Sequence, residues 1–216
     1  MRYFSSFTGI GGFDIAAQEL GLECVGMSEI DRYANMVLKY RFPHCKNYGD
    51  ITQIRWDEVP DFDVLLGGTP CQDLSVAGRR AGLAGSRSRL FFEFVRALKE
   101  KKPKYFIWEN VKGALSSNKG WDFATVLDSF SEAGYSLWWQ VLDATWFGIP
   151  QHRERVFIVG ASGDEPPIKV FFEPESSKKV DELQRPEVNT IRSQYWKNRS
   201  DGSFIAEGQQ HQKIEN

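Results

Sequence analysis

The chain of 216 residues carries 27 Lys or Arg against 29 Asp or Glu, a formal net charge of −2, and 41% of its residues are hydrophobic. This length suits one domain or a domain and a half, which can fold without a metal or a disulfide. The composition excludes the strongly basic balance of a typical DNA-binding domain, and no apolar run is long enough to cross a bilayer. No signal peptide follows Met1, so we expect a cytoplasmic protein.

Short apolar runs alternate with amphipathic stretches as far as residue 162. Strands are predicted over residues 2–7, 24–29, 63–67, 105–109, 137–142 and 155–162. Helices are predicted over residues 13–20, from the N-cap Asp31 to Pro43, over 90–98 and over 123–130, where apolar residues recur at helical spacing. This alternation indicates an α/β fold with a doubly wound, mostly parallel sheet.

The composition changes after Gly163. Prolines, a Ser-Ser-Lys-Lys run and sparse apolar residues replace the alternating pattern. We therefore expect residues 1–163 to form the α/β domain and residues 164–216 to be a linker or loosely ordered region.

The three cysteines, Cys24, Cys45 and Cys71, have wide and irregular spacing. No CxxC pair occurs, and the three histidines do not cluster with them. The pattern therefore predicts neither a zinc site nor a disulfide framework. A chemical role for one cysteine has to be judged from its neighbours.

A glycine-rich loop at residues 7–13 lies between the first predicted strand and the first predicted helix. Glycines allow backbone N–H groups to approach a ligand closely. Glu29 ends the second strand, where Rossmann-type folds place a carboxylate that binds ribose hydroxyls. Because Asp14 stands where a third glycine would favour a diphosphate, a cofactor without phosphates such as S-adenosylmethionine fits better. The alternative is a turn that only shapes the strand–helix corner.

Cys71 follows the third predicted strand within Gly67-Gly68-Thr69-Pro70-Cys71-Gln72. Its position places it at the carboxyl edge of the sheet, where such folds bind ligands. Residues 73–88 are rich in Gly, Ser and Arg, as expected of a loop that closes over a substrate, and nearby arginines favour a thiolate. An inert structural cysteine is the alternative.

Two further motifs carry charged groups. Glu109-Asn110-Val111 ends a strand at the same predicted edge, although strands also end this way for surface reasons alone. Gln151, Arg153 and Arg155 point to one side if their segment is extended, and two guanidinium groups suit a carboxylate or phosphate. A plain Arg–Glu surface pair is equally compatible.

Nine Lys or Arg lie between residues 79 and 104, opposed only by Glu93 and Glu100. A basic patch of this kind can guide a polyanion to one surface. A solvated basic helix face is the alternative.

Together, the four motifs resemble the DNA (cytosine-5)-methyltransferases, over about residues 2–160. The resemblance implies a class I S-adenosylmethionine-dependent, Rossmann-like catalytic domain over residues 1–163, encoded by a bacterium or phage. It implies a cofactor pocket formed by Phe7, Gly9, Gly11, Gly12, Phe13, Glu29, Ile30, Asp50, Ile51, Pro70 and Leu90. It further implies catalysis by Cys71, Glu109, Arg153 and Arg155, and contacts to double-stranded DNA from Gln72, Ser75, Arg87 and Gln151, with no metal and no membrane.

The implied reaction begins with addition of the Cys71 thiolate to cytosine C6, which makes C5 nucleophilic toward the methyl group. Glu109 hydrogen-bonds or protonates N3, and Arg153 and Arg155 orient Glu109 and the base. Because Cys71 has to reach the ring, the resemblance also implies that the base flips out of the duplex.

Residues 164–216 depart from the family pattern. Asn189-Thr190-Ile191-Arg192 resembles the start of the next block, and the segment before it is too short for the usual recognition region. We therefore interpret residues 164–216 as a linker and the truncated start of that region, and a partner chain could supply the rest. Two alternatives stay open: a catalytically inactive or split subunit that binds cofactor or DNA, and a Rossmann-type oxidoreductase with a reactive cysteine.

Overall fold

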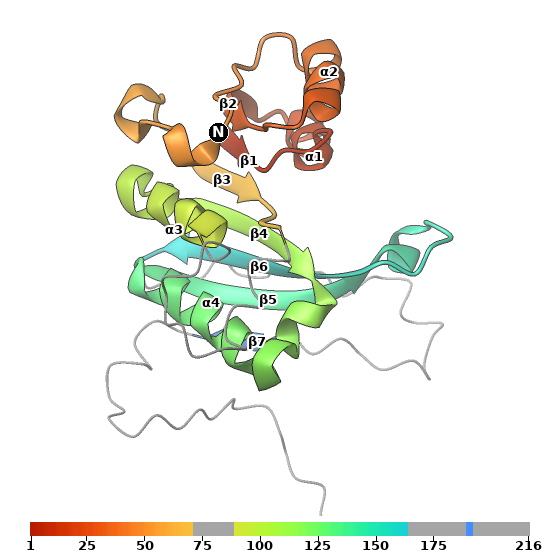
Figure 1. Ribbon diagram of the computed structural model, residues 1–216. Helices are drawn as coiled ribbons and strands as arrows, with labels where there is room; N and C mark the ends of the chain where they lie inside the picture. The colour runs from red at the N-terminus through yellow and green to blue at the C-terminus, as the bar shows by residue number, and fades with distance from the viewer. Residues whose placement is uncertain (71–88, 164–188, 192–216) are drawn as a thin grey trace, which may run out of the picture.

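The computed structural model describes residues 1–70, 89–163 and 189–191. Within these ranges, seven strands form one sheet in the order β2-β1-β3-β4-β6-β5-β7 (Figure 1). The strands are β1 (Arg2–Ser6), β2 (Glu23–Ser28), β3 (Val64–Gly67), β4 (Tyr105–Val111), β5 (Tyr135–Asp143), β6 (Glu154–Ser162) and β7 (Asn189–Ile191). The helices are α1 (Gly12–Glu19), α2 (Arg32–Arg41), α3 (Arg89–Lys101) and α4 (Trp121–Glu132). Short 3-10 helices include η1 (Ile51–Gln53), η2 (Trp56–Glu58), η5 (Lys112–Leu115), η6 (Ser117–Gly120) and η7 (Ala144–Phe147).

The α/β class is confirmed, and β1, β2, β3 and β4 are parallel to one another as predicted. However, β6 lies between β4 and β5 and is antiparallel to both, and β7 is antiparallel to β5. The connection from β5 to β6 is too short for a parallel crossover, which usually requires a dozen or more residues. The two strands therefore form a long hairpin, and the sheet is mixed.

Helices cover the sheet on both faces. On one face, α3 and α4 bury an aromatic core in which Phe106, Phe130 and Trp108 are fully enclosed. The rings of Phe106 and Phe130 lie 4.6 Å apart between centroids, and such aromatic pairs add about 0.5–1.5 kcal/mol each beyond burial. On the other face, Ala17 of α1 packs against Tyr3 and strand β3. The alternation of side chains along each strand thus separates two apolar layers.

The start of α2 agrees with the sequence prediction. Asp31 is extended, and its Oδ1 accepts hydrogen bonds from the N–H groups of Tyr33 at 2.9 Å and Ala34 at 2.8 Å. These bonds satisfy two of the N–H groups that every helix leaves unpaired at its start. Among helices in the described ranges, none combines the length and apolar character needed to cross a membrane.

The prediction about cysteine pairing is wrong, because Cys24 and Cys45 form a disulfide. Cys24 lies on β2, and the segment after α2 runs beside that strand: Asn47 forms a parallel bridge with Met27, whose N–H donates to the Lys46 carbonyl at 2.9 Å. Sequence spacing alone carries no information about this pairing. The disulfide therefore joins two chain segments that the fold already holds side by side.

Candidate active site

Several of the predicted site residues lie at one edge of the sheet. Strands β1 to β4 are parallel, so their carboxyl ends share this edge. Because β6 is antiparallel to β4, its first residues arrive at the same edge, and Val111 at the end of β4 pairs with Arg155. One rim of the sheet therefore carries the glycine loop, Glu29, Thr69-Pro70, Glu109 and Arg155.

The glycine loop adopts backbone angles that favour glycine. Gly9 has φ 57° and Gly11 has φ 88°, both in the left-handed region. A Cβ on Gly11 would lie 2.5 Å from a ring carbon of Phe42, so this glycine allows the loop to pack against the end of α2. By contrast, no atom lies within 4 Å of a Cβ added to Gly9 or Gly12. The open backbone at these two positions leaves room for a ligand.

Glu29 holds the loop from the end of β2. Its Oε2 accepts from the Gly9 N–H at 2.7 Å, and its Oε1 accepts from the N–H groups of Ile30 at 2.9 Å and Asp31 at 2.7 Å. A carboxylate offers about four lone-pair positions, so one position is left for a ligand hydroxyl. Ile30 is 74% exposed beside it. The carboxylate thus orders the loop and can still bind a ribose hydroxyl.

Asn47 is a residue of this site that the sequence analysis missed. Its Oδ1 accepts from the Glu29 N–H at 3.1 Å, and its Nδ2 donates to the Glu29 carbonyl at 2.9 Å. The same Oδ1 accepts from Gly49 N–H at 2.9 Å, just before Asp50, whose side chain caps η1 through Thr52 N–H at 2.9 Å. A single asparagine in a loop gives no recognisable signal in the sequence. Here it links Glu29 to the Asp50–Ile51 segment.

The peptide that leads to Cys71 is anchored on β4. Trp108 donates from Nε1 to Thr69 Oγ1 at 3.2 Å, and Asn110 donates from Nδ2 to the Thr69 carbonyl at 3.0 Å. Trp108 and Asn110 are both buried, which protects these bonds from water. The predicted residues Cys71, Gln72, Ser75 and Arg87 lie outside the described residues. The backbone that leads to them is nevertheless held on β4 at Thr69, just before Pro70.

Glu109 and Arg155 form an ion pair, with Arg155 Nε 2.9 Å from Glu109 Oε1. Their side chains are only 24% and 22% exposed, respectively. Glu109 pairs across the sheet with Phe157, so the carboxylate and Arg155 are diagonal neighbours on the same face. Gly68 approaches the pair closely, because a Cβ there would lie 2.6 Å from Glu109 Oε2. The carboxylate is thus held between a guanidinium group and the backbone that precedes Cys71.

The expectation of a single extended segment from Gln151 to Arg155 is only partly correct. Strand β6 begins at Glu154, and Gln151 lies before it, where its N–H donates to the Ile149 carbonyl at 2.8 Å. Arg153 bonds through its backbone N–H to Asp143 Oδ1 at 3.4 Å. In the part of the chain that the structure describes, its guanidinium group forms no ion pair. Of the two predicted arginines, Arg155 is the one that contacts Glu109.

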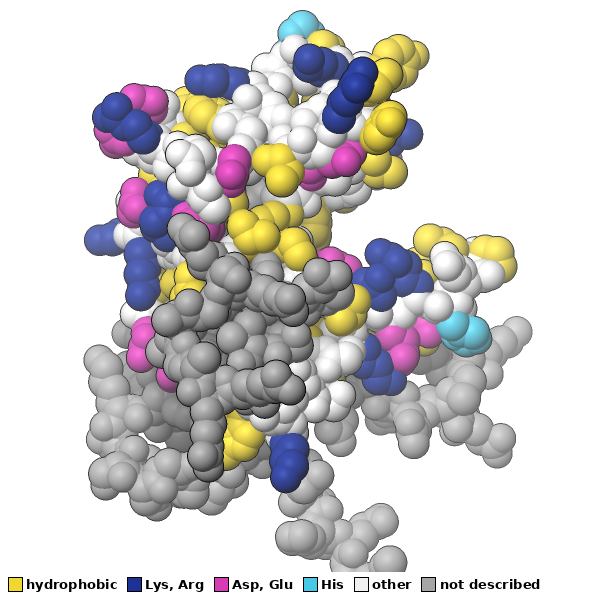
Figure 2. Space-filling model, in the orientation of Figure 1, with side chains coloured by type: hydrophobic (Ala, Val, Ile, Leu, Met, Phe, Trp, Pro, Cys, Tyr) yellow, Lys and Arg dark blue, Asp and Glu magenta, His cyan; other side chains and the backbone are white. Residues whose placement is uncertain are grey.

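The hairpin between β5 and β6 extends away from the sheet as an arm (Figure 1). Asp143 anchors its base by accepting from the Thr145 N–H and hydroxyl at 2.9 Å each, with His152 Nδ1 at 3.2 Å. The hydrogen bond from Thr145 N–H is the largest of the interactions that lower the pKa of Asp143 to about 2. Hydrophobic side chains lie at the tip, where Phe147 is 67% exposed, and Lys or Arg side chains lie nearer its base (Figure 2). The tip of the arm is therefore apolar, and the part nearer its base is charged.

The sequence predicts no metal site anywhere in the chain. Within residues 1–70, 89–163 and 189–191, no group of three or more His, Cys, Asp or Glu side chains is arranged to hold an ion.

The chain resembles known proteins in sequence and in structure. A family model described as "C-5 cytosine-specific DNA methylase" matches residues 1–216. Orphan methyltransferase M.SPRI of Bacillus phage SPR is 42% identical over 168 residues, which covers 76% of this chain and 38% of the phage protein. Type II methyltransferase M.NgoBV of Neisseria gonorrhoeae is 40% identical over 204 residues, covering 90% of this chain and 48% of the relative. The chain thus spans less than half the length of these two relatives.

Solved structures share the fold. The Dnmt2 methyltransferase of S. pombe aligns with a TM-score of 0.65 at 22% identity, over 86% of this chain and 59% of that one. A putative DNA modification methyltransferase from a prophage of E. coli aligns with a TM-score of 0.63 at 24% identity, over 75% of this chain and 47% of that one.

Proposed function

The chain belongs to the C-5 cytosine-specific DNA methylase family, and on this premise we propose that it transfers a methyl group from S-adenosylmethionine to C5 of cytosine in double-stranded DNA. The contact that carries the proposal is the Glu109–Arg155 ion pair beside Gly68, three residues before Cys71. This contact brings together the carboxyl group of Glu109, the guanidinium group of Arg155 and the backbone that leads to Cys71. Addition to a pyrimidine ring requires an acid and a nucleophile close together.

The glycine loop and its neighbours fit the cofactor. Residues 7–13 contain no Lys or Arg to neutralise a phosphate, and the open backbone at Gly9 and Gly12 leaves space for a ligand. Glu29 has capacity for a ribose hydroxyl. We propose that Phe7, Gly11, Phe13, Ile30, Asp50, Ile51, Pro70 and Leu90 form the rest of the pocket. When bound there, S-adenosylmethionine supplies an electrophilic methyl group on a positively charged sulfur.

The nucleophile is Cys71 in this proposal. Its thiolate forms a bond from Sγ to cytosine C6, and the electrons of the C5–C6 double bond become available at C5. After C5 is methylated, loss of the C5 proton and breakage of the Sγ–C6 bond restore the aromatic ring and the thiolate. The cytosine must leave the duplex to reach Cys71, so the proposal includes base flipping.

Glu109 acts on the ring nitrogen. A proton held between its carboxyl group and N3 removes the negative charge that addition at C6 places on the ring. General acid help of this kind is typically worth about 10²–10⁴ in rate. Arg155 holds the carboxyl group in position through the 2.9 Å ion pair. We assign Arg153 to the base or to the DNA backbone, and Gln72, Ser75, Arg87 and Gln151 to further DNA contacts.

The domain division remains part of the proposal. Residues 1–163 would bind the cofactor and carry the chemistry, and residues 164–216 would link this unit to a recognition region. Because the chain spans less than half of these two relatives, a partner chain that supplies that region is compatible with the proposal.

A covalent trap tests the chemistry directly. The chain is incubated with DNA that contains 5-fluorocytosine and with S-adenosylmethionine; fluorine cannot leave C5 as a cation, so the Sγ–C6 bond persists. We expect an adduct located at Cys71 by peptide mass, which Cys71→Ala abolishes while cofactor binding by calorimetry is retained. Glu109→Gln should slow adduct formation by about 10²-fold or more with unchanged cofactor affinity. Cofactor binding with no adduct, even when the part of a relative that this chain does not span is added in trans, would refute the catalytic proposal and support an inactive binding subunit.

A further inference from the structure

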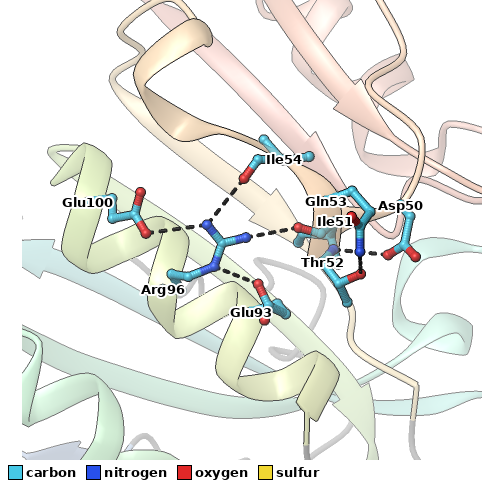
Figure 3. Close-up of polar contacts among 8 residues, drawn as sticks. All are labelled: Asp50, Ile51, Thr52, Gln53, Ile54, Glu93, Arg96 and Glu100. Atoms are coloured by element: carbon cyan, nitrogen blue, oxygen red, sulfur yellow. Dashed lines mark hydrogen bonds and ion pairs between the residues drawn. The ribbon is translucent and has the colours of Figure 1, made fainter.

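Arg96 of α3 reaches the segment that follows Asp50 (Figure 3). Its Nη2 donates to the Ile51 carbonyl at 3.0 Å and its Nη1 to the Ile54 carbonyl at 3.2 Å. These two carbonyls lie at the start of η1 and just after its end. Ile51 and Ile54 are 3% and 5% exposed, so their backbone oxygens have little access to water. The Ile51 carbonyl also accepts from the Ile54 N–H at 3.3 Å. One guanidinium group thus donates to both carbonyls and fixes η1 against α3.

Two carboxylates fix the guanidinium group itself. Glu93 Oε2 lies 2.6 Å from Arg96 Nε, and Glu100 Oε1 lies 3.3 Å from Nη1. The Cζ atom also lies 5.9 Å from the centroid of the buried Trp56 ring. A lysine could not reproduce this set, because its ammonium group lacks the planar arrangement of five donors. The position thus requires an arginine for geometry as well as for charge.

The segment held by Arg96 belongs to the proposed cofactor pocket. Asp50 caps η1 through Thr52 N–H, and Ile51 is the next residue along the wall. Leu90, another proposed pocket residue, lies on α3 itself, on the same helix as Arg96 and packed against the same core as Ile51. Arg96 therefore connects two walls of the pocket that come from separate parts of the chain.

We propose that Arg96 is a positioning residue for the cofactor: it sets the separation between the Asp50–Ile51 wall and the Leu90 wall. The inference rests on the proposed function, because it assumes that these walls enclose S-adenosylmethionine. Arg96 touches no reacting atom, and it acts through the two carbonyls that it binds. Its loss changes how tightly the cofactor is held and leaves the reacting groups in place.

Lys101 provides a matched control on the same helix. Its Nζ donates to the Val59 carbonyl at 2.8 Å and contacts Asp61 Oδ1 at 2.6 Å. It therefore joins α3 to the same stretch of chain, but beyond η2 and away from the pocket walls. Replacing either residue weakens the attachment of α3 to this stretch, so an effect that comes only from lost attachment should appear in both variants.

The test measures cofactor affinity by calorimetry and melting temperature for Arg96→Lys, Lys101→Ala and the unaltered chain. Arg96→Lys should raise the Kd for S-adenosylmethionine about tenfold through loss of charge-assisted bonds to the two carbonyls. Lys101→Ala should lower Tm about as much as Arg96→Lys does, but leave the Kd for S-adenosylmethionine unchanged. Glu93→Gln, which keeps the guanidinium group but loosens its orientation, should raise Kd by about threefold. In turnover, KM for the cofactor should rise in Arg96→Lys while kcat is retained.

The outcomes separate the two proposals. If the unaltered chain binds no S-adenosylmethionine, both the cofactor assignment and the role of Arg96 fail. If it binds, and Arg96→Lys and Glu93→Gln bind equally well, Arg96 only stabilises the fold. Equal rises in Kd for Arg96→Lys and Lys101→Ala would likewise overturn the inference, because the effect would then follow stability.

Discussion

Replacing Gly68 by alanine would place a methyl group against the carboxylate of Glu109. The added Cβ would lie 2.6 Å from Glu109 Oε2 and 3.1 Å from the Glu109 carbonyl oxygen, whereas real Cβ atoms essentially never approach within 3.0 Å. Gly68 has no left-handed backbone angle, so alanine is tolerated by the backbone itself. The carboxylate is the movable partner, and it has to retreat by about 0.4 Å or more, out of line with Arg155.

The expected result is a folded chain with impaired chemistry. Because the displaced atom ends a flexible side chain, the stability cost should be about 1 kcal/mol, which corresponds to a Tm decrease of roughly 2–4 °C. Misplacing a catalytic group by about 1 Å can cost about 10²-fold in rate, so we expect the adduct with 5-fluorocytosine DNA to form about 10–100-fold more slowly. Calorimetry should show unchanged cofactor affinity.

Gly113→Ala is a matched control for Gly68→Ala. The nearest atom to its added Cβ is Val111 Cγ2 at 4.0 Å, an ordinary contact. Normal adduct formation by Gly68→Ala would show that Glu109 does not depend on this contact. A loss of folding in Gly68→Ala but not in Gly113→Ala would show that the carboxylate is too rigidly held to move.

Three other perturbations test separate parts of the structure. Glu29→Ala should raise the Kd for S-adenosylmethionine by about 10–100-fold, since the glycine loop and the ribose both lose a charged acceptor; Glu23→Ala, also on β2, should leave it unchanged in calorimetry. Asp143→Ala should have a lower Tm than the unaltered chain above pH 4. Because the pKa of Asp143 is lowered to about 2, the difference in Tm between the two proteins should vanish as the pH falls from about 4 to 2. A difference in Tm that stays constant with pH in melting scans would contradict the anchoring role. Gly160→Ala should lower Tm by roughly 4–10 °C in calorimetric scans, because its Cβ would lie 2.0 Å from a ring carbon of the buried Phe106; an unchanged Tm would mean that the core is loosely packed there.

Local patterns in the sequence predicted those features of the structure that depend on residues close together in the chain. Asp31 caps its helix as predicted because capping depends on a side chain and the N–H groups two or three residues later. Glu29 was predicted to bind ribose hydroxyls because of its distance along the chain from the glycine loop; the structure places its Oε2 2.7 Å from the Gly9 N–H, and ribose binding stays a prediction. The contact between Glu109 and Arg155 was expected from the family resemblance and not from a local pattern, and only Arg155 of the two arginines forms it.

Pairings between distant segments could not be predicted in the same way. The place of β6 between β4 and β5 depends on long-range strand pairing, and no residue pattern within β6 encodes its neighbours. Cys24 and Cys45 meet because the chain returns beside β2 after α2. Arg96 and Lys101 belonged to a basic run interpreted as either a solvated face or a patch for a polyanion. Instead, both donate to carbonyls 42 residues away, and Arg96 also to one 45 residues away.

The two strands that carry Glu109 and Arg155 are hydrogen-bonded neighbours, and the peptide before Cys71 is tied to the first of them. The relative placement of these groups is therefore a property of the sheet ladder, independent of whatever segment reads the DNA sequence. Under the proposed function, exchange of a segment that reads DNA would alter which site is modified and leave the arrangement of these groups unchanged. New target preferences can arise by this route without rebuilding a catalytic centre.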